Sequence, residues 1–195
     1  MIVPPILPFT SKKQVLRMQA EAGRRAAAQE RPDAGEHAAR NFLSSVPIRG
    51  GATISLFASF RDEIDTWPLV EALLERGHRI ALPVTGKKGE PLTFREFKIG
   101  DELVPDSFGV PTPAPTAPEL TPEIVVAPLL AFTRRGDRLG YGAGFYDRTL
   151  ARLRREGEVL AVGFAFGAQE VDHLPTEDHD EPLDWIVTER ESIAV

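Results

Sequence analysis

Apolar and polar residues recur along the chain with two periods, one typical of helices and one typical of strands. Residues 12–30 place Val15, Leu16, Met18 and Ala22 among cations and continue into an alanine run, which predicts a helix. Three further helices are predicted, over residues 33–45 after Pro32, over residues 67–76 before Gly77, and over residues about 144–156. The chain therefore has helical segments at its start, in its middle and near its end.

β-Branched and apolar runs between these helices predict strands. They are expected at residues 52–58, 78–82, 91–97, 123–127, 159–165 and 185–188. A strand followed by a helix and a second strand is the βαβ pattern of a parallel sheet. We predict an α/β fold with a mostly parallel sheet flanked by helices, in which ligands bind at the carboxyl ends of the strands.

A proline-rich stretch divides the chain between residues 105 and 122, which contain six of its 17 prolines. Proline disfavours both helix and central strand, so an extended surface connection is expected there. The strand at residues 123–127 reads EIVVA and needs helices from earlier in the chain to cover its faces. We therefore interpret residues 1–195 as a single domain, a size that supports one hydrophobic core.

The composition excludes several kinds of protein and of site. Hydrophobic residues make up 42% of the chain and charged residues 27%, which does not suit a disordered chain. With no cysteine, disulfides, thiolate metal sites and cysteine nucleophiles are excluded, and a cytoplasmic location is expected. No apolar run reaches the roughly 18 residues of a membrane helix. Residues 1–9, broken by prolines and without preceding cations, are expected to form a terminal arm instead of a signal peptide.

The net charge of −6 conceals two basic segments. Residues 12–25 hold five cations and one acid, and residues 134–155 hold seven arginines and two aspartates. Local positive potential in an acidic chain favours a pocket for a small polyanion. The acidic remainder would repel a long phosphate backbone, so no nucleic-acid partner is expected. Two solvated basic helix faces remain the alternative.

The second basic segment includes a glycine-rich loop. Residues 134–148 read RRGDRLGYGAGFYDR, in which backbone N–H groups and the start of the following helix can converge on a phosphate. Arg134, Arg135 and Arg138 would add charge-assisted hydrogen bonds, and Asp147 is a suitable oxygen ligand for Mg²⁺. The loop matches neither the Walker loop nor the dinucleotide fingerprint, and a tight structural turn is the alternative.

The longer pattern GDRLGYGAGFYDR resembles the signature GxRLGxGxGYYDR of the 5-formyltetrahydrofolate cyclo-ligases, also called methenyltetrahydrofolate synthetases, with Phe145 replacing the first tyrosine. The Lys-x-x-x-Arg of that family's first helix is present as Lys13 and Arg17, and its DEIDT turn as residues 62–66. The closing EPLDWIVTE is also present, so the resemblance covers nearly the whole chain. Members usually read GLGFD just before the signature, where this sequence has LAFT at residues 130–133.

The resemblance implies an ATP-dependent cyclisation of 5-formyltetrahydrofolate to 5,10-methenyltetrahydrofolate. The formyl oxygen attacks the γ-phosphate, and the amine at position ten of the folate then closes on the activated carbon and expels phosphate. Positioning and charge neutralisation suffice for this chemistry, which needs no covalent enzyme intermediate. The resemblance further implies a three-layer fold related to the sugar-phosphate isomerases. We expect a monomer that acts on small molecules, with no nucleic-acid or membrane partner.

The resemblance also assigns residues to the two substrates. The ATP-binding residues would be Lys13, Arg17, Arg138, Leu139, Gly140, Tyr141, Gly142, Ala143, Gly144, Phe145 and Tyr146. The folate-binding residues would be Ala58, Phe60, Glu63, Tyr141, Gly142, Ala143, Gly144 and Phe145. Arg138 and Tyr146 would be catalytic, and Asp147 with Asp184 would hold Mg²⁺. Glu63 would accept hydrogen bonds from the pterin, and Phe60 would pack on its ring.

Each assignment has a simpler alternative. Lys13 and Arg17 would also suit a solvated helix face. Glu63 would also serve, with Asp65, as a cap for the helix at residues 67–76. Asp184 would also pair with a nearby arginine. The aromatic side chains of the glycine-rich loop would also suit the core; these are Tyr141, Phe145 and Tyr146.

A second acidic group lies near the end of the chain. His173 and His179, with Glu177, Asp178 and Asp180, resemble a metal cluster, but no helix or strand spacing aligns them. An ordinary acidic loop is the favoured interpretation. Two rival functions for the whole chain are a sugar-phosphate isomerase, which needs no ATP, and a folate- or nucleotide-binding regulatory protein without turnover.

Overall fold

The computed structural model describes residues 12–195, and the expected terminal arm at residues 1–9 lies outside them. The helices are α1 (Lys12–Glu30), α2 (Ala34–Ser45), α3 (Trp67–Glu75) and α4 (Phe145–Glu156), with a short 3₁₀ turn η1 (Gly167–Gln169). The four predicted α-helices are confirmed to within two residues at each end. Gly77, with φ of 80°, ends α3 in the left-handed conformation that glycine tolerates.

A seven-stranded sheet forms the centre of the fold, in the order β11-β10-β9-β6-β1-β2-β3. Its strands are β1 (Thr53–Ser55), β2 (Arg79–Val84), β3 (Thr93–Phe97), β6 (Ile124–Ala127), β9 (Leu160–Phe164), β10 (Trp185–Val187) and β11 (Ser192–Ala194). The five inner strands are parallel, and the two edge strands, β11 and β3, are antiparallel. The predicted α/β fold with a mostly parallel sheet is confirmed.

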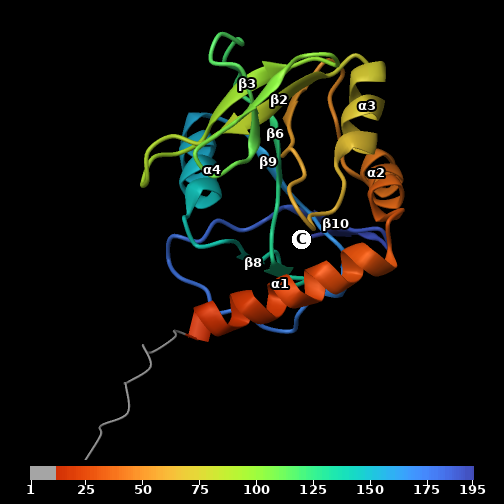
Figure 1. The fold of residues 1–195 in the computed structure, drawn as a ribbon, viewed down its shortest axis with the longest axis vertical. Coiled ribbons are helices and arrows are strands. Elements are labelled where there is room, and N and C mark those ends of the chain that lie inside the picture. Colours follow the sequence, from red (N-terminus) through yellow and green to blue (C-terminus); the bar gives the residue numbers. More distant parts are fainter. Residues whose placement is uncertain (1–11) are drawn as a thin grey trace, which may run out of the picture.

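Helices cover both faces of the sheet (Figure 1). α2 and α3 pack on one face, where Phe42 and Leu73 meet sheet residues such as Ile54 and Val126. α4 packs on the other face through Leu150 and Leu153. Each Leu or Phe buried in this way stabilises the fold by roughly 1.5–3 kcal/mol. All four residues of β6 are buried, as expected for a strand covered on both sides.

α1 occupies a different position from the other helices. It runs across the carboxyl ends of the parallel strands, at the bottom of the view in Figure 1. Leu16 and Ala20 of α1 pack on Leu130, Ala131 and Leu139, which lie in the segment after β6. The first basic segment is thereby placed over the edge of the sheet where ligands bind in open α/β folds.

β1 is shorter than predicted. The apolar run at residues 52–58 predicted a strand of seven residues, but the strand ends at Ser55. The Thr66 hydroxyl donates to the Phe57 carbonyl at 2.7 Å and draws the chain out of the sheet into a loop. Residues 56–58 stay buried, so their apolar character reflects the core and not the sheet.

The proline-rich connection contains a hairpin that the sequence did not predict. β4 (Leu103–Pro105) and β5 (Pro111–Pro113) form a separate two-stranded antiparallel sheet. Proline is tolerated in so short an edge pair because few ladder hydrogen bonds are required. A second small hairpin, β7 (Ala131–Phe132) with β8 (Arg138–Leu139), leads into the glycine-rich loop and was also unpredicted.

Within residues 12–195, no helix has both the length and the apolar character that a membrane span requires.

Candidate active site

The glycine-rich loop connects β8 to α4 at the carboxyl edge of the sheet. Gly142 has φ of 101° and Gly144, which precedes the first residue of α4, has φ of 67°. These left-handed conformations favour glycine, because a side chain there would strain the backbone. The loop thus places exposed backbone at the start of a helix, where unpaired N–H groups suit an anion.

Two of the predicted arginines lie against this loop. The Arg17 Nε donates to the Gly140 carbonyl at 3.0 Å. The Arg138 guanidinium also lies beside Gly140. One of its Nη atoms is 3.0 Å from the position that a Cβ would occupy on this glycine. Arg17 is on α1 and Arg138 on β8, so the structure brings together the two basic segments that the sequence separates.

Arg134 and Arg135 differ from this pattern. Arg134 forms a two-pronged ion pair with Glu191, with distances of 2.8 and 3.0 Å, and also contacts Glu170. Arg135 lies 3.8 Å from Asp137. Of these three arginines, Arg138 is the one that contacts the glycine-rich loop within residues 12–195.

A second loop, at residues 58–66, follows β1 and carries Glu63. Arg61 adopts φ of 57°, the one left-handed non-glycine conformation among residues 12–195, and such strain is concentrated at functional sites. Glu63 Oε2 accepts the Phe60 N–H at 3.0 Å, which fixes the carboxylate. Asp65 accepts the Trp67 N–H at the start of α3, so the helix is served by Asp65 and not by Glu63.

Glu63 is joined to the glycine-rich loop through Tyr141. The Tyr141 hydroxyl donates to Glu63 Oε1 at 2.5 Å, and it accepts a hydrogen bond from Arg24 of α1. Burial raises the pKa of Glu63, although the Tyr141 hydroxyl, the Phe60 N–H and the charge of Arg24 oppose this shift. The pKa of Tyr141 is raised, first by burial of the hydroxyl and then by the Glu63 charge.

The raised pKa of Glu63 predicts a pH dependence of stability. The folded state holds the Glu63 proton more tightly than the unfolded state, so the unfolding free energy falls as pH rises from about the ordinary value of 4.5 through the raised pKa. We expect wild type to lose stability relative to Glu63→Gln over this interval. Urea unfolding of both proteins between pH 4 and 7 measures the difference. A difference that stays constant with pH would contradict the prediction.

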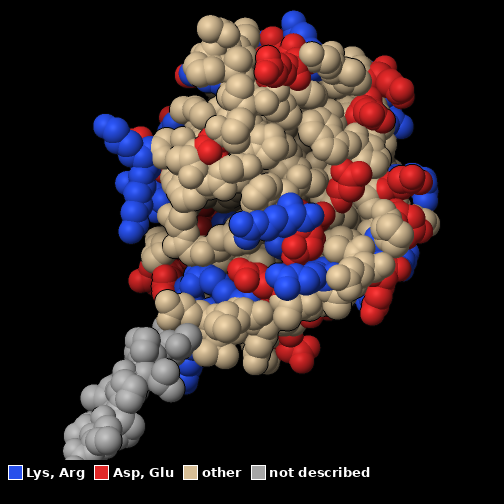
Figure 2. Space-filling model, viewed as in Figure 1, with Lys and Arg blue, Asp and Glu red and all other residues tan. Residues whose placement is uncertain are grey.

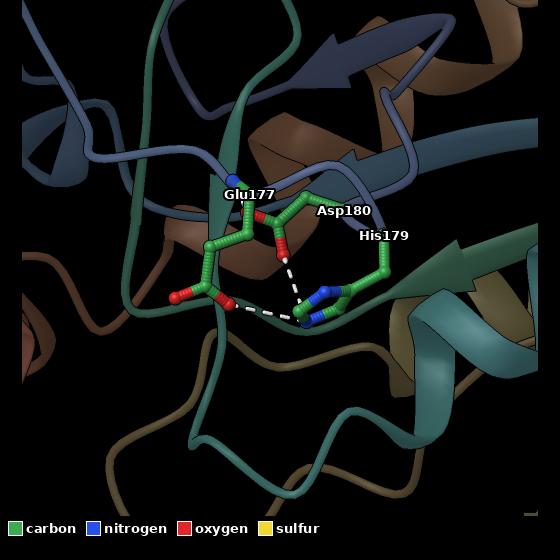
Figure 3. A group of neighbouring side chains, drawn as sticks. All are labelled: Glu177, His179 and Asp180. Carbon is green, nitrogen blue, oxygen red and sulfur yellow. Dashed lines mark hydrogen bonds and ion pairs between the residues drawn. The ribbon is translucent and has the colours of Figure 1, made fainter.

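Lys13 is paired with the acidic loop near the end of the chain. Its Nζ lies 3.0 Å from Glu177 and 3.8 Å from Asp180. Figure 3 shows the same two carboxylates turned toward His179, whose Nε2 lies 3.2 Å from Glu177. The group is largely exposed and already contains the Lys13 charge, which is typical of an ion-pair cluster on a surface loop.

The two predicted metal ligands each hold an arginine. Asp147 Oδ1 accepts from Arg138 at 2.9 Å and from the Glu181 N–H at 3.2 Å. Asp184 Oδ2 accepts from Arg154 at 3.1 Å and from the Ala161 N–H at 2.7 Å. Pairing with an arginine, the simpler alternative for Asp184, is thus present. The contacts found among residues 12–195 use one oxygen of each carboxylate.

Aromatic side chains surround the two loops. The Phe145 ring packs edge-on against Phe108 at 6.4 Å, and Gly109 lies beside the Phe60 ring. The Arg138 guanidinium lies 5.6 Å from the centre of the Tyr146 ring. Phe108 is at the tip of the hairpin between β4 and β5, so the proline-rich connection reaches the site. Sequence reasoning missed this contact because the only signal was one phenylalanine among prolines.

Within the described part of the chain, α1 and the ends of the strands pack closely against each other and leave no room for a small molecule between them. The residues that meet there are Arg24, Phe57, Glu63, Ile64, Pro128, Leu129, Phe164 and Gln169. Phe57 follows β1, Pro128 follows β6 and Phe164 ends β9, so this contact lies at the carboxyl edge of three neighbouring strands. Ala58 is buried just beyond Phe57.

Acidic side chains from other segments balance both basic segments. In Figure 2, cations along α1 alternate with acids that lie beside them. Pairs with acids from other parts of the chain include Arg24 with Asp62 and Glu63, Lys13 with Glu177 and Asp180, Arg134 with Glu170 and Glu191, and Arg154 with Glu181 and Asp184. Arg138 pairs with Asp147 of its own segment. The two basic segments are therefore less positive in the folded chain than in the sequence.

The fold and this arrangement are those of an α/β protein with a glycine-rich, arginine-bearing loop at the carboxyl edge of its sheet. The chain belongs to the 5-formyltetrahydrofolate cyclo-ligase family, whose model it matches over residues 9–189. It is 34% identical over 165 residues to the 5-formyltetrahydrofolate cyclo-ligase of Escherichia coli K12, covering 82% of this chain and 90% of that one. The corresponding Mycolicibacterium smegmatis protein is 34% identical over 166 residues, with 80% and 82% covered. The resemblance seen in the sequence motifs is confirmed.

Solved structures support the same fold. A 5,10-methenyltetrahydrofolate synthetase from Mycoplasma pneumoniae superposes with a TM-score of 0.72 at 22% identity, covering 92% of this chain and 99% of that one. The Aquifex aeolicus 5,10-methenyltetrahydrofolate synthetase superposes with a TM-score of 0.71 at 24% identity, covering 94% and 93%. At this level of identity the likeness shows a common fold.

Proposed function

We propose that the protein catalyses the ATP-dependent cyclisation of 5-formyltetrahydrofolate to 5,10-methenyltetrahydrofolate, with release of ADP and phosphate. The observation that carries this proposal is the contact between Glu63 and Tyr141. It joins a carboxylate suited to a pterin with a glycine-rich loop suited to phosphates. A site in which the two substrates react with each other must hold them side by side in this way.

The reaction proceeds by two displacements. The formyl oxygen attacks the γ-phosphorus of ATP, forming an O–P bond while the bond to the leaving ADP breaks. The amine nitrogen at position ten then attacks the activated carbon and loses its proton, and the carbon–oxygen bond breaks to release phosphate. Because the protein forms no covalent bond, its residues act by positioning the substrates and stabilising charge.

We assign the residues to the two substrates as in the sequence analysis. On the nucleotide side, Arg17 and Arg138 approach the loop over the phosphates, and Lys13 exchanges its acidic-loop partners for phosphate oxygens. On the folate side, Glu63 accepts hydrogen bonds from the pterin while Phe60 packs on the ring. Residues 139–146 of the loop bind ATP, residues 141–145 also contact the folate, and Arg138 and Tyr146 are the catalytic residues.

The predicted metal ligands, Asp147 on α4 and Asp184 before β10, are of a kind that suits magnesium. Asp147 and Asp184 offer hard oxygen ligands, and one oxygen of each carboxylate remains after the contacts among residues 12–195 are counted. Mg²⁺ typically binds through one or two carboxylates together with substrate phosphates. When bound, it would neutralise charge on the phosphates and on the leaving ADP. We assign Asp147 and Asp184 as its protein ligands.

An absorbance assay tests the proposed reaction. Methenyltetrahydrofolate absorbs where 5-formyltetrahydrofolate does not, so its formation by the purified protein can be followed with and without ATP. We expect formation that requires ATP and is accompanied by equimolar phosphate. Folate and ATP binding without turnover would favour a regulatory protein, and turnover of a sugar phosphate without ATP would favour an isomerase.

Arg17→Ala is expected to weaken ATP binding about tenfold or more, because a charge-assisted hydrogen bond contributes roughly 1.5–3 kcal/mol. Calorimetric titration with ATP measures the effect. The exposed Arg40→Ala on α2 removes the same charge away from the loop and is expected to bind ATP as wild type does. Equal affinities for all three proteins would remove Arg17 from the nucleotide site.

Several predictions about the whole protein rest on the sequence. We propose that the chain forms a single domain, since the hairpin of the proline-rich connection packs on β2 and β3. A monomeric state, a cytoplasmic location, the absence of a nucleic-acid partner and a fold relationship to sugar-phosphate isomerases likewise stay predictions.

A further inference from the structure

Arg24 is a buried cation that the sequence analysis did not place in the site. It lies on α1, and 4% of its surface is exposed. A guanidinium removed from water loses hydration free energy that its new contacts must replace. Its charged and hydroxyl partners all lie outside α1, on the two loops that form the candidate site. The side chain is therefore directed into the site instead of along the helix.

Arg24 contacts Tyr141, Asp62 and Glu63. One Nη donates to the Tyr141 hydroxyl, and the same nitrogen lies 3.7 Å from Glu63 Oε1. The other Nη lies 3.5 Å from Asp62. The guanidinium carbon is 5.5 Å from the centre of the Tyr141 ring. Arg24 thus contacts the carboxylate assigned to the pterin both directly and through Tyr141.

These contacts do not satisfy the guanidinium fully. The Arg24 Nε is buried and has no hydrogen-bond partner among residues 12–195, and the two carboxylate distances exceed those of a close ion pair. A buried donor without a partner costs stability. An arginine whose only role was to fix α1 would be expected to have closer carboxylate partners and a partner for its Nε. The arrangement therefore indicates a role in the site for which stability is given up.

Burial disfavours the ionised form of Glu63, which is the form suited to binding the pterin. Both Glu63 oxygens can accept hydrogen bonds, with no O–H facing the pterin N–H donors, only when the group is ionised. Burial raises the pKa of Glu63, and the neighbouring Asp62 raises it further. Arg24 acts in the opposite direction, together with the Tyr141 hydroxyl and the Phe60 N–H. Of the side chains that shift the pKa of Glu63, Asp62 is an anion, Tyr141 is a neutral hydroxyl and Arg24 is the cation.

We propose that Arg24 is a positioning residue for folate recognition, which keeps the Glu63 carboxylate anionic and oriented without itself touching the pterin. The inference rests on the proposed role of Glu63. It adds that α1 serves both substrates. Arg17 contacts the nucleotide loop, and Arg24, seven residues further along the helix, contacts the Glu63 carboxylate that would bind folate. Removal of Arg24 would then impair folate binding and leave the phosphate contacts in place.

The test compares folate and ATP binding in variants of the full chain. Arg24→Met keeps much of the side-chain volume and removes the charge, and Arg24→Lys keeps the charge. We expect Arg24→Met to weaken 5-formyltetrahydrofolate binding about tenfold or more while ATP affinity changes by less than about threefold. Arg24→Lys is expected to recover part of the loss. The half-exposed Arg31, just beyond α1, supplies the control Arg31→Met.

The pH profile provides a readout that a purely structural role would not change. In Arg24→Met, folate affinity is expected to fall with decreasing pH at a higher pH than in wild type, since Glu63 takes up its proton earlier. Glu63→Gln should abolish the difference between the two profiles. Arg24→Met in the Glu63→Gln background should add little to the loss from Glu63→Gln alone, because both substitutions act on the same carboxylate.

The outcomes separate this inference from the proposed function. If Glu63→Gln weakens folate binding and Arg24→Met does not, the role of Arg24 is overturned while that of Glu63 stands. If Glu63→Gln binds folate as wild type does, both roles fail, whatever the turnover assay gives. Fully additive losses would also overturn the inference. Should Arg24→Met not fold, Arg24→Lys and Arg24→Gln decide: better folate binding by the lysine variant supports the inference, and equal loss overturns it.

Discussion

Replacing Asp147 by asparagine is expected to lower turnover about a hundredfold and to raise the magnesium concentration that gives half the maximal rate. The amide keeps the volume and one weak oxygen ligand but removes a negative charge beside the phosphates. Because γ-phosphoryl transfer depends on neutralising the phosphate charge with Mg²⁺, weaker Mg²⁺ binding should lower the turnover number. Initial rates measured against free Mg²⁺ for wild type and Asp147→Asn make the comparison.

The structure adds a control to this experiment. Asp147 also holds Arg138, whose side chain is 5% exposed, so the substitution is expected to lower the unfolding free energy by about 1–3 kcal/mol. Thermal unfolding separates this loss from the catalytic one, because a folded variant at assay temperature still shows the magnesium effect. Asp178→Asn, on the exposed acidic loop, removes the same charge elsewhere. A wild-type magnesium curve for Asp147→Asn would remove Asp147 from the metal site.

The helices and the inner strands of the fold could be predicted from the sequence, because burial on one or two faces leaves a clear apolar pattern. β6 reads as uninterrupted apolar residues and is buried throughout. The hairpins β4–β5 and β7–β8 were missed, since strands of two or three residues bury too little to produce a period. The end of β1 was misplaced because residues 56–58 are buried by a loop and not by the sheet.

Some residues of the candidate site could be predicted from the sequence, and others could not. The glycine-rich loop and Glu63 follow from motifs that are local in the chain. Arg24 did not, because on α1 it is one cation among several, and its burial comes from loops more than thirty residues away. Only the tertiary arrangement distinguishes it from the exposed Arg25 that follows it. Sequence patterns therefore find residues that act through backbone geometry more readily than side chains that act through long-range pairing.

The net charges of the two basic segments were likewise misjudged, because long-range pairing is invisible in the sequence. The two basic segments were counted without the acids that fold against them, so the positive potential of the site was overestimated. Arg24, Lys13 and Arg134 each have a carboxylate partner from another segment. A polyanion entering this site must compete with those carboxylates, and the proposed role of Lys13 in nucleotide binding requires that Glu177 be displaced from it.

Replacing Glu63 by glutamine is expected to raise the Michaelis constant for 5-formyltetrahydrofolate by about ten- to a hundredfold, equivalent to the roughly 1–3 kcal/mol cost of an unsatisfied buried polar group. Both Glu63 oxygens are acceptors in the structure, one for the Phe60 N–H and one for the Tyr141 hydroxyl. A glutamine must turn its NH₂ toward one of these donors, whichever way its amide is oriented. The same group would face the N–H donors of the pterin.

The Michaelis constant for ATP should change much less, since Glu63 lies on the loop after β1 and carries the wrong charge for phosphate. Asp65→Asn is the matched control: it removes one charge from the same loop but keeps the oxygen that accepts the Trp67 N–H. We expect wild-type constants for both substrates in Asp65→Asn. Equal increases for folate and ATP in Glu63→Gln would show that Glu63 supports the whole site, and its assignment to the pterin would then be wrong.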